Sequence, residues 1–162
     1  MVTEDGTGLP DAESYLSVAD ADSYHTARAN SAWAELDGPA KEAALRYATD
    51  YLDGTYRWRG EIKEEAQALG WPREDAYDDE GRELTGLPRA LRHATAEIAL
   101  AHTQEAINEP QGPRVTSESV EGAVSVTYAD REGNQGASYP IVYTLIRGLI
   151  RGGTNAVRVR RA

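Results

Sequence analysis

The residues best suited to do chemistry are four consecutive ones, Tyr56, Arg57, Trp58 and Arg59. Aromatic rings that alternate with cations suit single-stranded nucleic acid, because bases stack on the rings and phosphates pair with the cations. The stretch is short, however, and the chain has a formal net charge of -10, which repels phosphate. We therefore favour the alternative, in which Trp58 packs against helices and the two arginines pair with nearby carboxylates.

Other reactive groups do not form a recognisable motif in the sequence. The chain has no cysteine, and its three histidines, His25, His93 and His102, are not spaced like metal ligands. Counting back from Gly81, the first ligand position of an EF-hand loop falls on Ala76, which cannot bind calcium. The glycines form no phosphate-binding motif. We expect no enzymatic activity, no metal site and no cofactor.

The stretch QALGWPR, residues 67–73, places a tryptophan and a proline in a short polar loop. Tryptophan is large and tends to be buried, and proline restricts the chain beside it. We expect Trp71 to fill a gap between the longest helix and residues 55–60, Pro72 to fix its direction, and Arg73 to pair with an acid of the same or a neighbouring subunit. The alternative places all three within the core of one subunit. The structural anchors expected here are Tyr56, Trp58, Trp71, Pro72 and Arg73.

Helical periodicity dominates the first two thirds of the chain. Ser17 can cap a helix over residues 18–29, and Pro39 and Gly54 mark the first turn and the end of another over 37–54. A short helix is expected near 61–69, and the longest one follows Pro88, over residues 88–108. Apolar residues on most sides of this last helix predict a central position. Ile141, Leu145 and Leu149 indicate one more short helix before Gly152.

Alternation of apolar and polar residues replaces the helical period between 111 and 140. It predicts a β-hairpin with Val124, Val126 and Tyr128 on one face. The last residues, AVRVRRA, alternate as an extended strand would. The fold class expected is mainly α, a bundle of about four helices with a β-hairpin insertion and an extended C-terminal arm. Its regions are a flexible acidic N-terminus (1–14), the helical bundle (15–110), the hairpin and loop (111–140), and a short helix with a basic arm (141–162).

Charge is distributed unevenly along the chain. Residues 138–162 contain five arginines and no acid, whereas the 27 acidic residues all precede them. Such a tail suits an acidic partner, which could be nucleic acid, another subunit or another protein. The alternative is that the tail neutralises its own body. No run of 18 apolar residues occurs, so we expect no membrane span.

Several stretches together resemble the head–tail connector, or adaptor, proteins of tailed bacteriophages. They are YLSVADADSYHTAR, ALRYATDYLDGTYRWRG, the string of Gln67, Leu69 and Trp71-Pro72-Arg73, the alanine-rich helix opened by Pro88, and the final VRVRRA. The resemblance runs from Ser14 to the end. Relatives of this group are sometimes labelled DnaT-like single-stranded-DNA-binding proteins.

The resemblance implies a structural adaptor of the virion neck, assembled in the host cytoplasm. Such proteins form a ring, usually of twelve copies, beneath the portal protein and join it to a tail terminator or stopper, while genomic DNA passes through the channel without specific binding. The alternative function is a single-stranded-DNA-binding module of phage replication. Residues expected to contact the portal or a neighbouring subunit are Val124, Val126, Tyr128, Val157, Arg158, Val159, Arg160 and Arg161.

Overall fold

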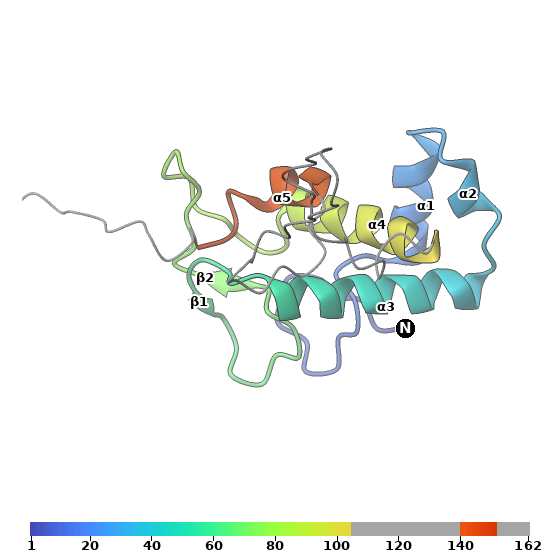
Figure 1. Ribbon diagram of the computed structural model, residues 1–162. Helices are drawn as coiled ribbons and strands as arrows, with labels where there is room; N and C mark the ends of the chain where they lie inside the picture. The colour runs from blue at the N-terminus through green and yellow to red at the C-terminus, as the bar shows by residue number, and fades with distance from the viewer. Residues whose placement is uncertain (105–139, 152–162) are drawn as a thin grey trace, which may run out of the picture.

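The computed structural model describes residues 1–104 and 140–151, and within these ranges the fold is mainly helical (Figure 1). Helices α1 and α2 lie at one end of the molecule and a small antiparallel sheet lies at the other. None of the helices in the described ranges has the length and apolarity needed to cross a bilayer. The elements in chain order are α1 (Val18–Thr26), α2 (Ser31–Ala34), α3 (Gly38–Thr55), β1 (Glu61–Ile62), β2 (Arg73–Glu74), α4 (Arg89–Thr103) and α5 (Pro140–Ile146).

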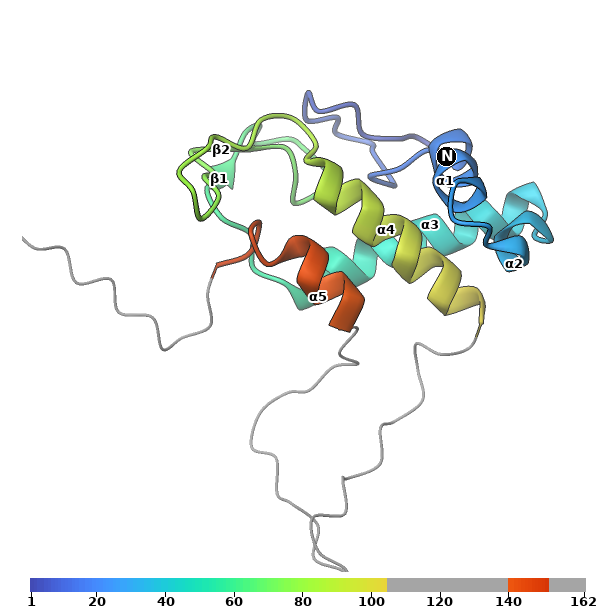
Figure 2. The same ribbon diagram turned by 90° about the horizontal axis from the view of Figure 1, so that it is seen from above.

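The centre of the fold is the packing of α4 across α3, with α5 beside α4 on the side away from α1 (Figure 2). The side chain of Asp37 caps α3 by accepting a 2.8 Å hydrogen bond from the Ala40 amide, and Pro39 occupies the first turn. Small residues such as Ala48 and Ala94 are fully buried between the helices, which lets the two backbones approach closely. The buried positions of α4 are Leu91, Ala94, Thr95, Ala96, Ile98, Ala99 and Leu100.

The helices expected from the sequence correspond to α1, α3, α4 and α5, with different bounds. The first ends at Thr26 rather than at 29, and residues 105–108 of the longest one lie outside the described ranges. The helix expected near 61–69 is wrong, because β1 pairs there with β2, with Glu61 opposite Glu74 and Ile62 opposite Arg73. Gly60, at φ +71°, turns the chain into that pairing.

The predicted hairpin and C-terminal arm lie outside the described residues, and so do the interface residues expected there. The antiparallel pairing that the structure does contain is that of β1 with β2. The division of the chain into four regions stays a prediction. The residues concerned are Val124, Val126, Tyr128, Val157, Arg158, Val159, Arg160 and Arg161.

The N-terminal segment is packed against the helices in the structure, and its expected flexibility stays a prediction. Glu4 is 3% exposed, and its carboxylate accepts hydrogen bonds of 2.9 Å from the amides of Gly6, Gly8 and Leu9. Thr3 pairs with Ser14, which is fully buried. Hydrogen bonds to one buried carboxylate therefore organise this loop, although its apolar content is sparse.

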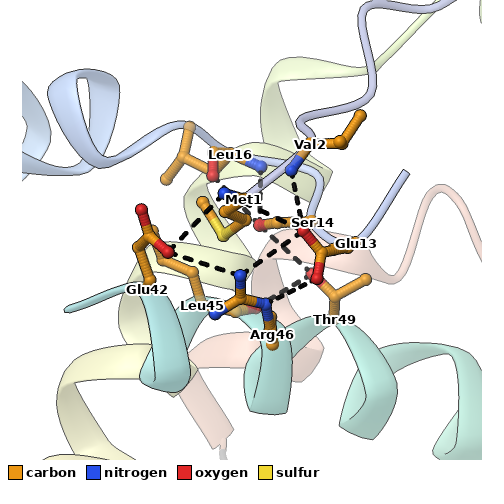
Figure 3. A network of polar contacts seen from close by, with 9 residues as sticks. All are labelled: Met1, Val2, Glu13, Ser14, Leu16, Glu42, Leu45, Arg46 and Thr49. Atoms are coloured by element: carbon orange, nitrogen blue, oxygen red, sulfur yellow. Dashed lines mark hydrogen bonds and ion pairs between the residues drawn. The ribbon is translucent and has the colours of Figure 1, made fainter. Parts of the chain in front are cut away.

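Ion pairs attach the same segment to α3 (Figure 3). The guanidinium Nε of Arg46 lies 2.9 Å from a carboxylate oxygen of Glu13, and its Nη2 lies 3.3 Å from Glu42. The α-ammonium of Met1 lies 3.6 Å from Glu42 and 3.9 Å from Glu13. Thr49, on the same helix, accepts a hydrogen bond of 3.3 Å from the amide of Tyr15. Tyr15 in turn contacts the tryptophan cluster through Asp53.

Candidate nucleic-acid interface

Two tryptophans that the sequence singled out meet in the core. Trp58 is 6% exposed and Trp71 is fully buried, and their rings lie edge to face with centroids 6.2 Å apart. Tyr56 packs on the other side of Trp58 at 6.3 Å. The peptide bond between Trp71 and Pro72 is cis, and Pro72 is buried as well. The burial of these residues agrees with an anchoring role, which itself stays a prediction.

Asp53, at the end of α3, holds this cluster together. Its carboxylate accepts hydrogen bonds from the phenol of Tyr15 at 2.6 Å, the indole Nε1 of Trp58 at 2.8 Å and the amide of Gly70 at 2.8 Å. Burial, and then the negative charge of Asp53, raise the pKa of Tyr15 well above its usual range. The indole of Trp58 is therefore both buried and hydrogen-bonded, so it offers no face on which a base could stack.

Arg73 is held by backbone groups in the described part of the chain, and its expected pairing with an acid of a neighbouring subunit stays a prediction. Within residues 1–104 and 140–151 it forms no ion pair, and it donates instead to the carbonyl oxygens of Arg59 at 2.7 Å, Gly60 at 2.9 Å and Gly70 at 3.0 Å. The pairing of β2 with β1 places the guanidinium against these carbonyls. Desolvation, followed by the charge of Arg151, lowers its pKa. Carbonyl groups satisfy the donors of Arg73, and the negative charges of Asp53 and Glu61 only partly offset the lowering of its pKa.

A cleft of about 520 Å³ opens beside this cluster. We call it the Arg57 cleft; it is lined by Asp53, Tyr56, Arg57, Trp58, Ile62, Gln67, Ala68, Leu69, Gly70, Arg73 and Arg151. Arg57 is exposed, and Ile62 is 54% exposed at the rim. Burial raises the pKa of Tyr56 to about 12, so its phenol stays protonated at neutral pH. The lining holds three guanidinium groups and one carboxylate, and that carboxylate is already occupied by three donors.

The third guanidinium comes from the far end of the described chain. Ile150 forms a bridge with Trp58, the amide of Arg151 donates to the carbonyl of Arg57 at 2.7 Å, and the Arg151 side chain donates to the carbonyl of Gly60 at 2.8 Å. Sequence reasoning missed Arg151 at this site. No local signal could have found it, because the contact joins segments more than 90 residues apart.

The four residues of the alternating stretch separate in space. Tyr56, Arg57 and Trp58 all line the cleft, but Trp58 is only 6% exposed. Arg59 forms an ion pair with Asp79 at 2.6 Å and donates to the carbonyl of Ile150 at 2.8 Å. Trp58 and Arg59 therefore pack and pair as the alternative interpretation expected. Arg57 remains exposed and cationic.

Metal chemistry has no support in the described part of the chain, where no group of three or more potential His, Cys, Asp or Glu ligands gathers. His93 and His102 make separate contacts: the His102 ring stacks on Tyr47 at 3.7 Å, and the His93 ring lies 4.7 Å from that of Tyr24. The arrangement at the Arg57 cleft is suited to binding an anion rather than to activating a nucleophile.

Comparisons with known proteins identify a family. No curated protein and no solved structure matches the chain. A family model described as "Putative DnaT-like ssDNA binding protein" matches residues 1–162. This corresponds to the second label of the resemblance noted from the sequence, and the comparisons give no support to the head–tail connector label. Because the match spans residues 1–162, the chain belongs to this DnaT-like family.

Proposed function

We propose that the protein binds single-stranded DNA and that the Arg57 cleft is the binding surface. The observation that carries the proposal is the convergence of Arg57, Arg73 and Arg151 on one cleft of a protein whose net charge is -10. A cluster of arginines on a protein of negative net charge suits an anionic partner. Phosphate fits the planar, forked donors of guanidinium groups. The name of the family to which the chain belongs supports nucleic acid as the source of that phosphate.

The three arginines would act differently. Arg57 and Arg151 are exposed and can each donate to a phosphate oxygen. The donors of Arg73 are directed at carbonyl groups, so this residue contributes through its charge. Tyr56 is half-buried and provides the aromatic face on which one base can stack, with Ile62 as an apolar neighbour across the cleft.

The affinity for DNA should depend on the number of phosphate contacts and on the negative net charge of the protein. Two or three phosphate contacts give a salt dependence with a slope of about -0.7 per contact, so the logarithm of the affinity should fall with a slope of about -2 against the logarithm of salt concentration. Repulsion between the acidic body and the strand lowers the affinity further at low salt, where charges are least screened. We therefore expect modest affinity and no strong base preference.

The test is fluorescence anisotropy of a labelled oligothymidine of about 16 nucleotides, a length that covers one small binding site. The double variant Arg57→Gln/Arg151→Gln should bind at least about tenfold more weakly and show a shallower salt slope. Arg147→Gln is the matched control, because Arg147 is exposed and lies outside the Arg57 cleft. Absence of binding by the unaltered chain at low salt, or equal affinity in all three proteins, would contradict the proposal.

A second candidate function is the structural adaptor of a phage neck, and one observation favours it. Helix α5 presents Ile141 and Tyr143 to solvent, 59% and 54% exposed. Exposed apolar side chains on a short helix suit coverage by another subunit or by a portal protein. In this proposal the chain forms a ring, contacts a portal and a tail terminator or stopper, and lines a channel that DNA traverses without specific binding.

Native mass spectrometry of the chain, alone and mixed with a portal protein, tests the adaptor. A ring that forms with the portal and is lost in an Ile141→Ser/Tyr143→Ser variant would support it. A deletion of residues 156–162 should abolish docking and leave the fold intact. A chain that stays monomeric in the presence of a portal would exclude this candidate and leave DNA binding at the Arg57 cleft unaffected.

A further inference from the structure

A second cationic pocket lies between α1 and the first turns of α4, two helices that pack against each other. Its volume is about 290 Å³, near the lower end of the range for ligand pockets, about 300–1,000 Å³. We call it the Arg92 pocket; it is lined by Leu16, Asp20, Ser23, Tyr24, Arg28, Arg89, Arg92 and His93. It shares no lining residue with the Arg57 cleft.

The arginines of this pocket outnumber its one lining carboxylate, Asp20. Within residues 1–104 and 140–151, Arg28, Arg89 and Arg92 form no ion pair. Arg28 donates to the carbonyl of Tyr24 at 3.1 Å and lies 3.5 Å above the centre of its ring. Arg92 is exposed. Three guanidinium groups around one hollow repel one another unless an anion joins them.

The carboxylates nearby are bound to other groups. Asp20 accepts a 2.8 Å hydrogen bond from the hydroxyl of Ser17, which caps α1. Glu97 accepts a 2.6 Å hydrogen bond from the phenol of Tyr24. Both carboxylates are hydrogen-bonded to hydroxyl groups, and neither forms an ion pair with the three arginines.

His93 also lines the pocket, and its protonation state can respond to a bound anion. Its Nε2 accepts a hydrogen bond of 3.3 Å from Nε of Arg89, which places the ring proton on Nδ1. Burial, followed by the positive charges of Arg89, Arg28 and Arg92, lowers the pKa of His93. An anion in the pocket would oppose these charges and favour the imidazolium, which could then donate to the anion.

We propose that the Arg92 pocket binds a phosphate group. The guanidinium fork suits the tetrahedral oxyanion, and arginines from two elements, Arg28 after α1 and Arg92 on α4, can donate to it from different directions. The pocket also lies at the N-terminal end of α4, where the helix dipole adds positive potential. The phosphate can be free, terminal on a nucleotide strand, or internal to its backbone.

The first experiment uses inorganic phosphate and the full chain. NMR of the His93 ring in a non-phosphate buffer should show a saturable shift on addition of phosphate and a rise in the pKa of His93. The double variant Arg28→Gln/Arg92→Gln should weaken phosphate binding at least about tenfold, whereas Arg147→Gln should bind as the unaltered chain does. No saturable shift of His93, or equal binding in the double variant, would overturn the proposal.

A second experiment identifies the source of the phosphate. Oligothymidines that differ only in a 5′-phosphate or a 5′-hydroxyl are compared by the same His93 signal. A shift with the 5′-phosphate alone supports a strand end, and a shift with both supports the backbone. A response to inorganic phosphate alone supports a small free ligand.

This inference does not rest on the proposed DNA binding. The Arg57→Gln/Arg151→Gln variant should keep the full phosphate response of His93, because neither residue lines the Arg92 pocket. In the unaltered chain, no anisotropy signal with oligothymidine alongside an intact His93 response would refute the Arg57 cleft alone. The reverse pattern would refute the Arg92 pocket alone.

Discussion

The phenol of Tyr15 donates a hydrogen bond of 2.6 Å to the carboxylate of Asp53, 38 residues further along the chain. The same carboxylate receives the indole N–H of Trp58 and the amide of Gly70, and the phenol oxygen accepts a 3.1 Å bond from the amide of Trp71. One ionised side chain thus joins the segment before α1, the end of α3 and both tryptophan segments. Removal of the Asp53 carboxylate should therefore disturb the Arg57 cleft, because Asp53, Trp58 and Gly70 all line that cleft.

Asp53→Ala should lower the free energy of unfolding by about 3 kcal/mol or more, because buried donors that lose their acceptor each cost about 1–3 kcal/mol. Urea denaturation followed by tryptophan fluorescence measures this. Asp50→Ala is the control, since Asp50 is exposed on the same helix, and it should change stability little. Equal stability of the two variants would show that Asp53 does not organise the cluster.

Trp71→Ala should destabilise the fold by about 3–5 kcal/mol, the usual cost of removing a buried tryptophan. Trp71 is fully buried against Trp58, so a cavity would open between them. Thermal melting of this variant is compared with that of Tyr143→Ala, whose side chain is 54% exposed. A melting temperature like that of the unaltered chain would refute the anchoring role of Trp71.

Local sequence patterns were enough to predict the main helices. Asp37 and Pro39 mark the start of α3, and the apolar spacing around Ala94 and Ile98 marks the buried face of α4. The short α2 was missed, because its burial depends on Trp33, whose indole finds its partner Asp22 at 2.7 Å on α1. The 61–69 stretch has helix-forming composition, but pairing of β1 with β2 overrides it.

The candidate sites depend on contacts that no local pattern encodes. Arg151 reaches the Arg57 cleft through the pairing of Ile150 with Trp58, and Arg28 meets Arg92 because α1 packs against α4. The alternation of Tyr56, Arg57, Trp58 and Arg59 raised a nucleic-acid surface as one interpretation, although packing was favoured there. The packing of Trp58 was expected, but the sequence could not show that carbonyl groups bind the guanidinium of Arg73.

Gly60→Ala should destabilise the protein by more than about 1 kcal/mol, because its backbone has a φ of +71° that side-chain-bearing residues rarely adopt. A Cβ at this position would also collide with the carbonyl oxygen of Glu74. Since the Gly60 carbonyl accepts from both Arg73 and Arg151, the variant should weaken DNA binding too. Gly54→Ala, with open space around its Cβ position, is the control for both urea denaturation and anisotropy, and equal behaviour of the two variants would refute this assignment.

Stability should fall as the pH drops below about 6.5, the ordinary pKa of histidine. His25 is 1% exposed, its ring lies 4.7 Å from that of Trp33, and its Nδ1 lies 3.0 Å from the Asn30 amide nitrogen. Burial lowers its pKa in the folded state. Between that lowered value and 6.5 the unfolded chain binds more protons, so the free energy of unfolding must rise with pH, by at most about 1.4 kcal/mol per pH unit for one histidine.

Urea denaturation between about pH 5 and 6.5, above the range in which carboxylates titrate, isolates this effect. His25→Gln should flatten the slope while keeping a group that can accept from Asn30. His93, whose pKa is also lowered, adds a smaller contribution of the same sign, because it is more exposed and solvent screens its charge interactions. Non-phosphate buffers are required, since phosphate in the Arg92 pocket would raise the pKa of His93. An unchanged slope in His25→Gln would mean that the buried imidazole does not limit stability in acid.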